Sequence, residues 1–224
     1  MVIEFLAILI LFGFVLSHSI LATQTVKNKL GWSQRTFRLV YNILAVLSFG
    51  LLLQGLSILA THADHQTIAA IITPTPEIKQ LILILQLIGI IFVLGAWIQT
   101  NPLKFMGLLP ENPNNDLHSG WFYRFSRHPM YFGVLLIIVP DIFMRTNLIW
   151  ILTNLIFALY LIVGAIPEEM RMKKTFPSYA MFHSTRGFLF PWKISHFQSL
   201  FSKNTPNSVE EQLSKEIYTK KEKI

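Results

Sequence analysis

The fold is decided by residues 126–169, which read SRHPMYFGVLLIIVPDIFMRTNLIWILTNLIFALYLIVGAIPEE. Two apolar segments in this stretch, Pro129–Met144 and Leu148–Ile166, are separated by only three residues, and such a short connection is typical of two antiparallel helices. At 1.5 Å per residue these helices would be about 24 and 28 Å long, close to the membrane hydrocarbon core of about 30 Å. The hairpin therefore brings the basic residues before its first helix beside the acidic residues after its second.

Three further apolar runs precede the hairpin, and each is long enough to cross a membrane as a helix, which takes ~20 residues. They cover Val2–Ala22, Leu39–Leu59 and Gln80–Ile98. Hydrophobic residues make up 52% of the chain and charged residues only 14%, which argues against a soluble domain. We therefore predict an all-α integral membrane helix bundle, with about five transmembrane helices and a carboxyl-terminal helical hairpin.

The basic residues indicate how these spans are oriented. The net charge is +7, but the basic residues flank apolar runs and do not form a stripe with aromatic residues, so nucleic acid is not an expected partner. Of the 19 Lys and Arg residues, 17 follow the first, third or fifth span. Because positively charged loops stay in the cytoplasm, we expect the amino terminus outside and the carboxyl terminus inside. Residues 1–195 would form the membrane-embedded domain, and residues 196–224 a polar cytoplasmic tail, flexible or with a short surface helix.

The residues at the two ends of the hairpin suggest an ionic ligand. Pro129 suits the first position of a helix, so the free N–H groups after it, with Arg127 and His128 in front, favour a carboxylate or phosphate. Glu168 and Glu169 can accept hydrogen bonds from amine or hydroxyl groups. A ligand with a carboxylate at one end and an amine and hydroxyl groups elsewhere would suit both clusters. The simpler alternatives are a basic cluster that serves topology alone and a solvated acidic helix start.

Metal and thiol chemistry have little support in the sequence. The chain has no cysteine, which excludes disulfides, thiolate metal sites and a cysteine nucleophile. His62 and His65 have a spacing that suits metal binding on a helix, but a third ligand is missing from the pattern. No metal site is therefore predicted.

Four short motifs in the carboxyl-terminal half carry a family resemblance. They are YRFSRHPMYFG at 123–133, EEMRM at 168–172, FPSY at 176–179 and FLFP at 188–191. In order and spacing they resemble the carboxyl-terminal half of the isoprenylcysteine carboxyl methyltransferase-like superfamily, except that Met172 and Pro177 stand where Leu and Gly are usual. The amino-terminal half, with its Ser17-His18-Ser19 cluster, is similar to the NnrU and methanethiol S-methyltransferase branch. The resemblance covers most of residues 5–192.

The resemblance implies S-adenosylmethionine as methyl donor, bound at the cytoplasmic face by the carboxyl-terminal half. Arg127, His128 and Tyr131 would contact the donor, and Glu168 and Glu169 would hold its amine or its ribose hydroxyl groups. The implied protein is an enzyme of the bacterial inner membrane that transfers a methyl group to a small thiol or a lipophilic acceptor, with transfer to sulfur expected.

The acceptor is expected to depend on the amino-terminal half. A thiol reacts as thiolate and needs a base or cation nearby, and His18, Arg35 and Arg38 fall on the predicted cytoplasmic side. An apolar acceptor would enter from the lipid bilayer. Two alternatives stay open: a non-enzymatic NnrU-like membrane protein associated with nitrogen-oxide metabolism, and a membrane NAD(P)H-dependent reductase of similar architecture. The sequence leaves the oligomeric state open.

Overall fold

The computed structural model describes residues 2–62, 74–109, 120–145, 147–176 and 179–190. Within these ranges the regular structure is helical, apart from an isolated bridge between Ser126 and Gly187. The helices are α1 (Val2–Leu21), α2 (Gln24–Leu30), α3 (Gln34–His62), α4 (Pro76–Gln99), α5 (Pro102–Phe105), α6 (Trp121–Phe125), α7 (Pro129–Asp141), α8 (Leu148–Thr175) and α9 (Tyr179–Thr185). A 3₁₀ turn, Ile142–Met144, follows α7. The prediction of an all-α membrane helix bundle is confirmed.

Four of the described helices are long and apolar enough to cross a membrane by length and composition, namely α1, α3, α4 and α8. The first arm of the hairpin, Pro129–Met144, is a shorter apolar segment. Large apolar side chains point outward along the bundle, for example Val46 and Leu51, which are 72% and 75% exposed. Such an apolar exterior suits contact with lipid.

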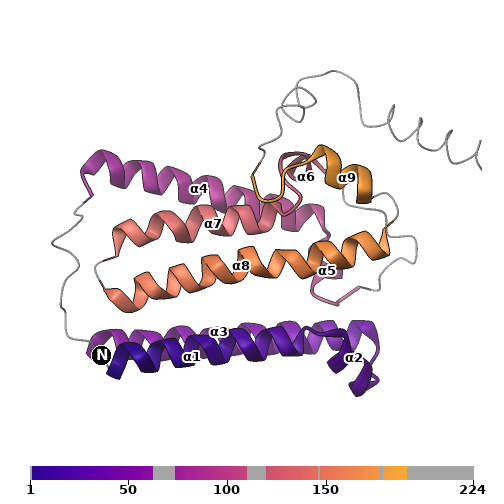
Figure 1. Ribbon diagram of the computed structural model, residues 1–224, viewed down its shortest axis with the longest axis horizontal. Helices are drawn as coiled ribbons and strands as arrows, with labels where there is room; N and C mark the ends of the chain where they lie inside the picture. The colour runs from indigo at the N-terminus through magenta and orange to yellow at the C-terminus, as the bar shows by residue number, and fades with distance from the viewer. Residues whose placement is uncertain (1, 63–73, 110–119, 146, 177–178, 191–224) are drawn as a thin grey trace, which may run out of the picture.

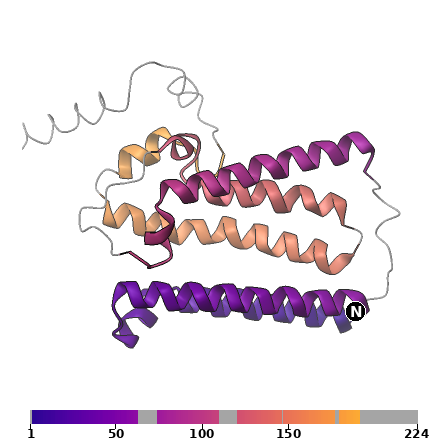
Figure 2. The ribbon, with the colours of Figure 1, turned by 180° about the vertical axis from the view of Figure 1, so that it is seen from behind.

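The bundle has three layers in the views of Figures 1 and 2. Helix α8 lies between the α4–α7 pair and the α1–α3 pair. The short helices α2, α5, α6 and α9 gather at one end, and the amino terminus and the hairpin turn lie at the other. The segments that follow the first, third and fifth predicted spans are therefore at the same end of the molecule.

Helices α4 and α7 are held together by close backbone contact. A Cβ added to Gly133 would lie 2.6 Å from the Gly89 carbonyl oxygen, and a Cβ on Gly89 would lie 2.6 Å from the Gly133 carbonyl oxygen. Next to this contact, the rings of Phe92 and Phe132 meet edge to face with centroids 4.9 Å apart. Because small residues let two helices approach closely in a membrane, this pair fixes where the first turn of α7 sits.

The α1–α3 pair is joined to α8 by an apolar cluster and a polar anchor. The buried cluster includes Leu11, Leu56 and Ile149. Asn147 caps α8, because its Oδ1 accepts from the Ile149 N–H at 2.9 Å, and its Nδ2 donates to the Ala60 carbonyl at 3.1 Å. The amino-terminal and carboxyl-terminal halves therefore form one packed unit.

Two expected helix boundaries are wrong. Helix α8 continues through Pro167 to Thr175, so Glu168 and Glu169 lie inside a helix and do not form a solvated helix start. Proline removes one backbone hydrogen bond but does not prevent the helix from continuing. Lys27 and Lys29 lie on α2, and Arg35 and Arg38 lie on α3, which begins at Gln34, so all four basic residues that follow the first span are on helices. The predicted tail helix and the residues His65 and Pro177 fall outside the described residues.

Candidate functional site

The start of α7 and the last part of α8 meet at the end of the bundle, and their charged residues are in direct contact. Arg127 Nε lies 2.6 Å from Glu169 Oε1. The His128 ring sits between the two carboxylates, with Nδ1 3.8 Å from Glu168 Oε2 and Nε2 3.5 Å from Glu169 Oε1. Tyr131 donates its hydroxyl hydrogen to Glu168 Oε2 at 2.9 Å. The structure therefore brings together all five residues that were expected at the donor site.

The basic residues are held in place by the segment that follows α9. Ser126 is fully buried, and its hydroxyl donates to the Phe188 carbonyl at 2.9 Å and accepts from the His128 N–H at 3.1 Å. The Arg127 N–H donates to the Gly187 carbonyl at 3.0 Å. These bonds fix the backbone just before α7, so the side chains of Arg127 and His128 start from a rigid position.

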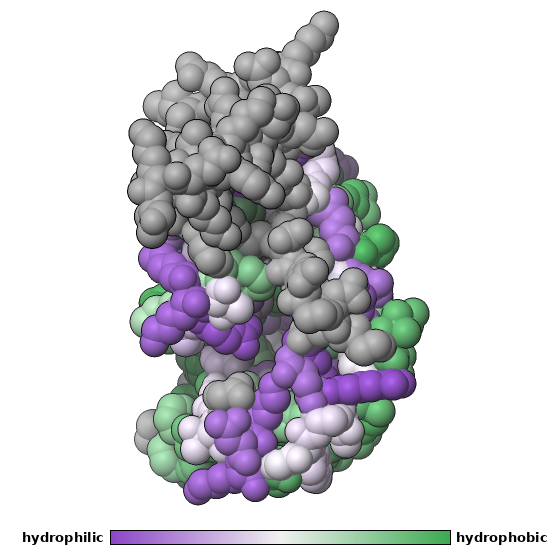
Figure 3. All heavy atoms as spheres, turned by 90° about the vertical axis from the view of Figure 1, so that its right-hand side faces the viewer, coloured by the Kyte–Doolittle hydropathy of each residue, from purple (hydrophilic) through white to green (hydrophobic). Residues whose placement is uncertain are grey.

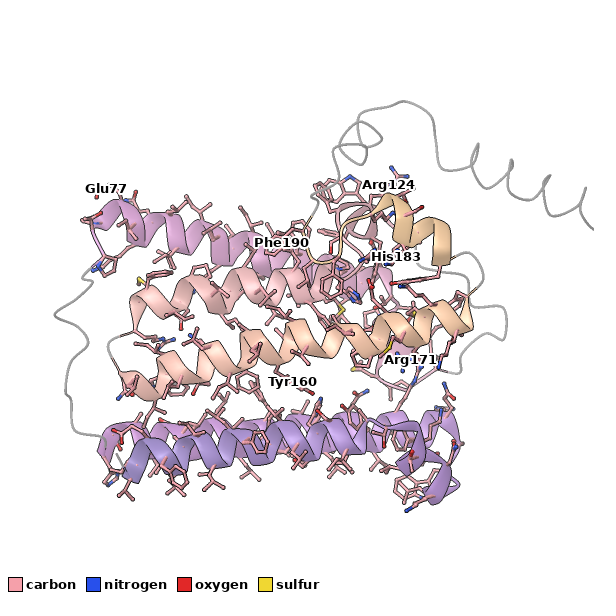
Figure 4. All side chains as sticks on the ribbon, in the orientation of Figure 1. Glu77, Arg124, Tyr160, Arg171, His183 and Phe190 are labelled. Carbon is pink, nitrogen blue, oxygen red and sulfur yellow. The ribbon has the colours of Figure 1, made fainter. Side chains whose placement is uncertain are left out.

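Helix α9 supplies two further partners of the acidic pair. Tyr179 donates its hydroxyl hydrogen to Glu169 Oε1 at 3.3 Å, and His183 Nε2 lies 3.7 Å from Glu169 Oε2. Arg127 Nη1 donates to the His183 carbonyl at 2.8 Å. Figure 4 shows His183 and Arg171 at this end of the molecule and Glu77 at the other. Sequence reasoning missed both α9 residues. Tyr179 stood in the FPSY motif without a role, and His183 carried no signal beyond its spacing of four residues from Tyr179.

The two neighbouring carboxylates have different environments. The side chain of Glu169 is 12% exposed and contacts Arg127, whose side chain is 8% exposed. The side chain of Glu168 is 34% exposed. Glu169 turns to Arg127. Glu169 is thus part of the scaffold, and Glu168 is the accessible acceptor.

Burial decides the protonation of the neighbouring rings. Desolvation lowers the pKa of His128, and this effect outweighs the opposing attraction of Glu168 and Glu169. Desolvation, with a smaller contribution from Glu168, raises the pKa of Tyr123 to about 12. His128 is therefore neutral at pH 7. Its buried Nε2 faces Glu169 Oε1 at 3.5 Å.

The three residues expected to act on the acceptor lie on α1 and α3. His18 Nε2 is 2.7 Å from the Tyr41 hydroxyl, and the His18 ring is half-buried between α1 and α3. Arg38 Nη1 donates to the Lys104 carbonyl at 3.4 Å, so this side chain turns to α5. Arg35 is exposed in the first turn of α3. The structure therefore places His18 in a polar pair and both arginines at the end face.

The end face that carries the site is hydrophilic. Figure 3 looks onto it and shows hydrophilic side chains in the middle and lower part of the view, with hydrophobic side chains along the edges. Among the described residues, no group of three or more His, Cys, Asp or Glu side chains is arranged to hold a metal ion. The chemistry that this site offers is recognition of charge and of hydrogen-bonding groups.

Comparison with known proteins identifies a family match over both halves of the bundle. Residues 6–196 match the protein family described as NnrU protein. No curated protein and no solved structure is significantly similar to the chain. The matched range begins within α1 and continues past α9, so it contains the whole cluster around Glu169 and the His18–Tyr41 pair.

Proposed function

Because the chain belongs to the NnrU protein family, within the isoprenylcysteine methyltransferase-like superfamily, we propose that it is a membrane methyltransferase that uses S-adenosylmethionine. Its acceptor in this proposal is a small thiol or a lipophilic molecule. The observation that carries the proposal is the cluster at the end of the bundle, in which an accessible Glu168 adjoins the buried Arg127–Glu169 pair and a neutral His128.

The charge of this cluster suits the proposed donor. Arginine stays protonated in proteins, so Arg127 balances one of the two carboxylates, and one negative charge is left on the cluster. S-adenosylmethionine carries a sulfonium and an ammonium group against one carboxylate, so one positive charge remains on the donor.

Each residue then has a distinct task. Glu168 would accept hydrogen bonds from the donor's amine or ribose hydroxyl groups, since it is the accessible carboxylate. The first N–H groups of α7 and the ring of His128 would face the donor's carboxylate, because helix starts favour anions. The ion pair of Arg127 and Glu169 would hold Glu168 and His128 in position. Bound S-adenosylmethionine supplies a methyl group that is already activated as a sulfonium.

The acceptor side of the proposal depends on the amino-terminal helices. Transfer would form a bond between the methyl carbon and the acceptor's sulfur or oxygen and break the donor's sulfur–methyl bond, which leaves a neutral thioether. His18 would take the proton of the acceptor's S–H or O–H group, a role that suits an imidazole in a polar pair. Arg35 and Arg38 would add positive charge at the cytoplasmic end.

Ligand binding tests this proposal directly. The protein in lipid nanodiscs is titrated with S-adenosylhomocysteine and, separately, with NADPH, and thermal stability is measured. A ligand at a hundred times its Kd stabilises the folded state by about 2.7 kcal/mol. We expect this increase with S-adenosylhomocysteine only. An increase with NADPH alone would contradict the proposal and support the reductase alternative.

The variant Glu168→Gln shows whether the ligand uses the proposed cluster. It removes a charged acceptor, so Kd for S-adenosylhomocysteine should rise roughly 10- to 150-fold, which corresponds to about 1.5–3 kcal/mol. Glu77→Gln, on α4 at the opposite end, is the matched control and should leave Kd unchanged. Equal affinities of both variants for S-adenosylhomocysteine would show that the donor does not bind at this cluster.

A labelled-methyl screen across thiols, prenylcysteines and phospholipids then identifies the acceptor.

A further inference from the structure

A small cavity that is partly open to the surface lies between α1 and α3, away from the acidic cluster. Its volume is about 150 Å³. The lining residues are Ser17, His18, Leu21, Tyr41, Leu44, Ala45 and Ser48. None of these side chains is Lys, Arg, Asp or Glu, and four of the seven carry a hydroxyl or imidazole group. Because an uncompensated charge is costly in an apolar surrounding, this lining selects a neutral ligand.

The hydrogen-bonding groups of the cavity have a surplus of acceptors. Ser17 donates its hydroxyl hydrogen to the Phe14 carbonyl at 3.0 Å, and Ser48 donates to the Ala45 carbonyl at 3.1 Å. Both serines therefore offer only lone pairs to a ligand. In either tautomer of His18, one hydrogen of His18 or Tyr41 is used in the hydrogen bond between the two side chains. One further hydrogen stays available for donation to a ligand. A ligand that donates a hydrogen bond would match this set.

The volume indicates the size of molecule that fits inside the cavity. An apolar protein cavity of about 150 Å³ is known to accept benzene, so a compact molecule of roughly six to eight non-hydrogen atoms fits. The apolar part of such a ligand would contact Leu21 and Leu44, and its polar end would meet the serines and His18.

The cavity is connected to the helix that carries the acidic pair. Ser19, next to His18, donates its hydroxyl hydrogen to the Tyr160 hydroxyl at 3.3 Å, and the rings of His18 and Tyr160 are 6.3 Å apart. Tyr160 lies on α8, eight residues before Glu168, which is about 12 Å along the helix. The α1 side of the cavity is thus in contact with α8, the helix that also carries the acidic pair.

We propose that this cavity, between α1 and α3, binds a compact neutral molecule that carries an O–H, N–H or S–H donor. The next part of the proposal rests on the proposed function. In that case the cavity is the site that selects the methyl acceptor, and His18 is the residue that receives the acceptor's proton.

Cysteine labelling tests the cavity without any donor present. The chain has no cysteine, so Ala45→Cys provides a single reactive thiol in the lining. Its reaction with N-ethylmaleimide is followed in nanodiscs with phenol, which has a donor, with anisole, which has a similar size but no O–H donor, and with 2,6-di-tert-butylphenol, which is too large. Phenol at ten times its Kd should slow labelling about tenfold, because only the empty fraction reacts. The other two probes should slow it less than twofold.

The control is Val46→Cys, whose side chain is 72% exposed on the same helix and lies outside the cavity lining. All three probes should leave its labelling unchanged. Protection by anisole equal to that by phenol, or equal slowing of Val46→Cys, would overturn the proposal. If Ala45→Cys does not fold, Ser48→Cys reports on the same cavity with the same expected order of probes. Binding of S-adenosylhomocysteine is measured in parallel, so the loss of donor binding and the loss of probe protection are separate results.

Discussion

Glu168 and Glu169 are neighbours in the chain that differ in what each one does. Glu169 is enclosed by Arg127, Tyr179 and His183, whereas Glu168 keeps a partly exposed carboxylate and one bond from Tyr131. Two adjacent residues on a helix point about 100° apart, so one can face the scaffold while the other faces a ligand. The buried residue is expected to control stability and the accessible residue to control binding.

Glu169→Gln should destabilise the fold far more than it changes the shape of the site. The substitution leaves the guanidinium of Arg127 buried without its counter-charge, and breaking a buried ion pair in this way costs roughly 3–5 kcal/mol. Unfolding in a denaturing detergent measures the loss. Glu77→Gln is the control, because Glu77 is exposed on α4, and it should leave stability almost unchanged. A similar loss of stability in both variants would show that Glu169 is not part of the scaffold.

The stability of the protein should fall as the pH decreases below 6.5, partly through His128. Burial lowers the pKa of His128 from its usual 6.5, so the unfolded chain binds the proton first as the pH falls. The contribution is therefore complete above pH 6.5 and is lost between 6.5 and the lower pKa of the folded state. Thermal melting from pH 8 to pH 5 should show a shallower decline for His128→Gln. The control His62→Gln, at an exposed position, should keep the original slope.

At the scale of elements, the site depends on where α7 begins, and this depends on α4. The Gly89–Gly133 contact and the ring contact of Phe92 with Phe132 bring the first turns of α7 against α4. The preceding segment is bonded to residues 187–188, after α9. The basic residues are thus fixed by elements that are distant in the sequence.

Gly133→Ala should lower both stability and donor affinity. The added Cβ would lie 2.6 Å from the Gly89 carbonyl oxygen and 2.9 Å from the Val93 nitrogen, and backbone atoms cannot yield easily. Overpacking of this kind costs about 1–3 kcal/mol. In Gly13→Ala, on α1, the new methyl group meets nothing within 4 Å, so stability should stay equal or increase by up to about 1 kcal/mol. Thermal melting and S-adenosylhomocysteine titration of both variants measure the two effects. A Gly133→Ala protein as stable as Gly13→Ala would show that α4 and α7 do not need this close approach.

At the scale of the whole molecule, polar segments and proposed sites share one end. Helices α2, α5, α6 and α9 lie there together with the acidic cluster, and the hairpin turn and the start of α4 lie at the other end. Among the described residues, all Lys and Arg side chains except Lys79 and Arg145 belong to segments at the end that carries the site, so the positive-inside rule predicts that this end faces the cytoplasm.

The orientation can be tested with single cysteines in this cysteine-free chain. A membrane-impermeant maleimide applied to intact cells should label Glu77→Cys, at the end with few basic residues, and should not label Lys29→Cys on α2. In inverted membrane vesicles the pattern should reverse. Labelling of Lys29→Cys in intact cells would place the proposed donor site outside.

The sequence by itself determined the hairpin and the meeting of its basic and acidic ends. Apolar length, a three-residue connection and Pro129 at a helix start are local features, and local features fix which residues reach the same membrane face. The prediction that Arg127, His128, Tyr131, Glu168 and Glu169 lie close together is confirmed by their contacts. Their role with a donor stays a prediction.

Only the tertiary structure decided which carboxylate is buried and which residues complete the site. The side chains of α9 reach Glu169 because the chain folds back after α8, and a periodic pattern cannot show where such a segment docks. The contact of Gly89 with Gly133 and the pairing of His18 with Tyr41 also join separate helices. Long-range packing of this kind depends on the shapes of several helices at once. Neither the apolar pattern nor any single motif contains that information.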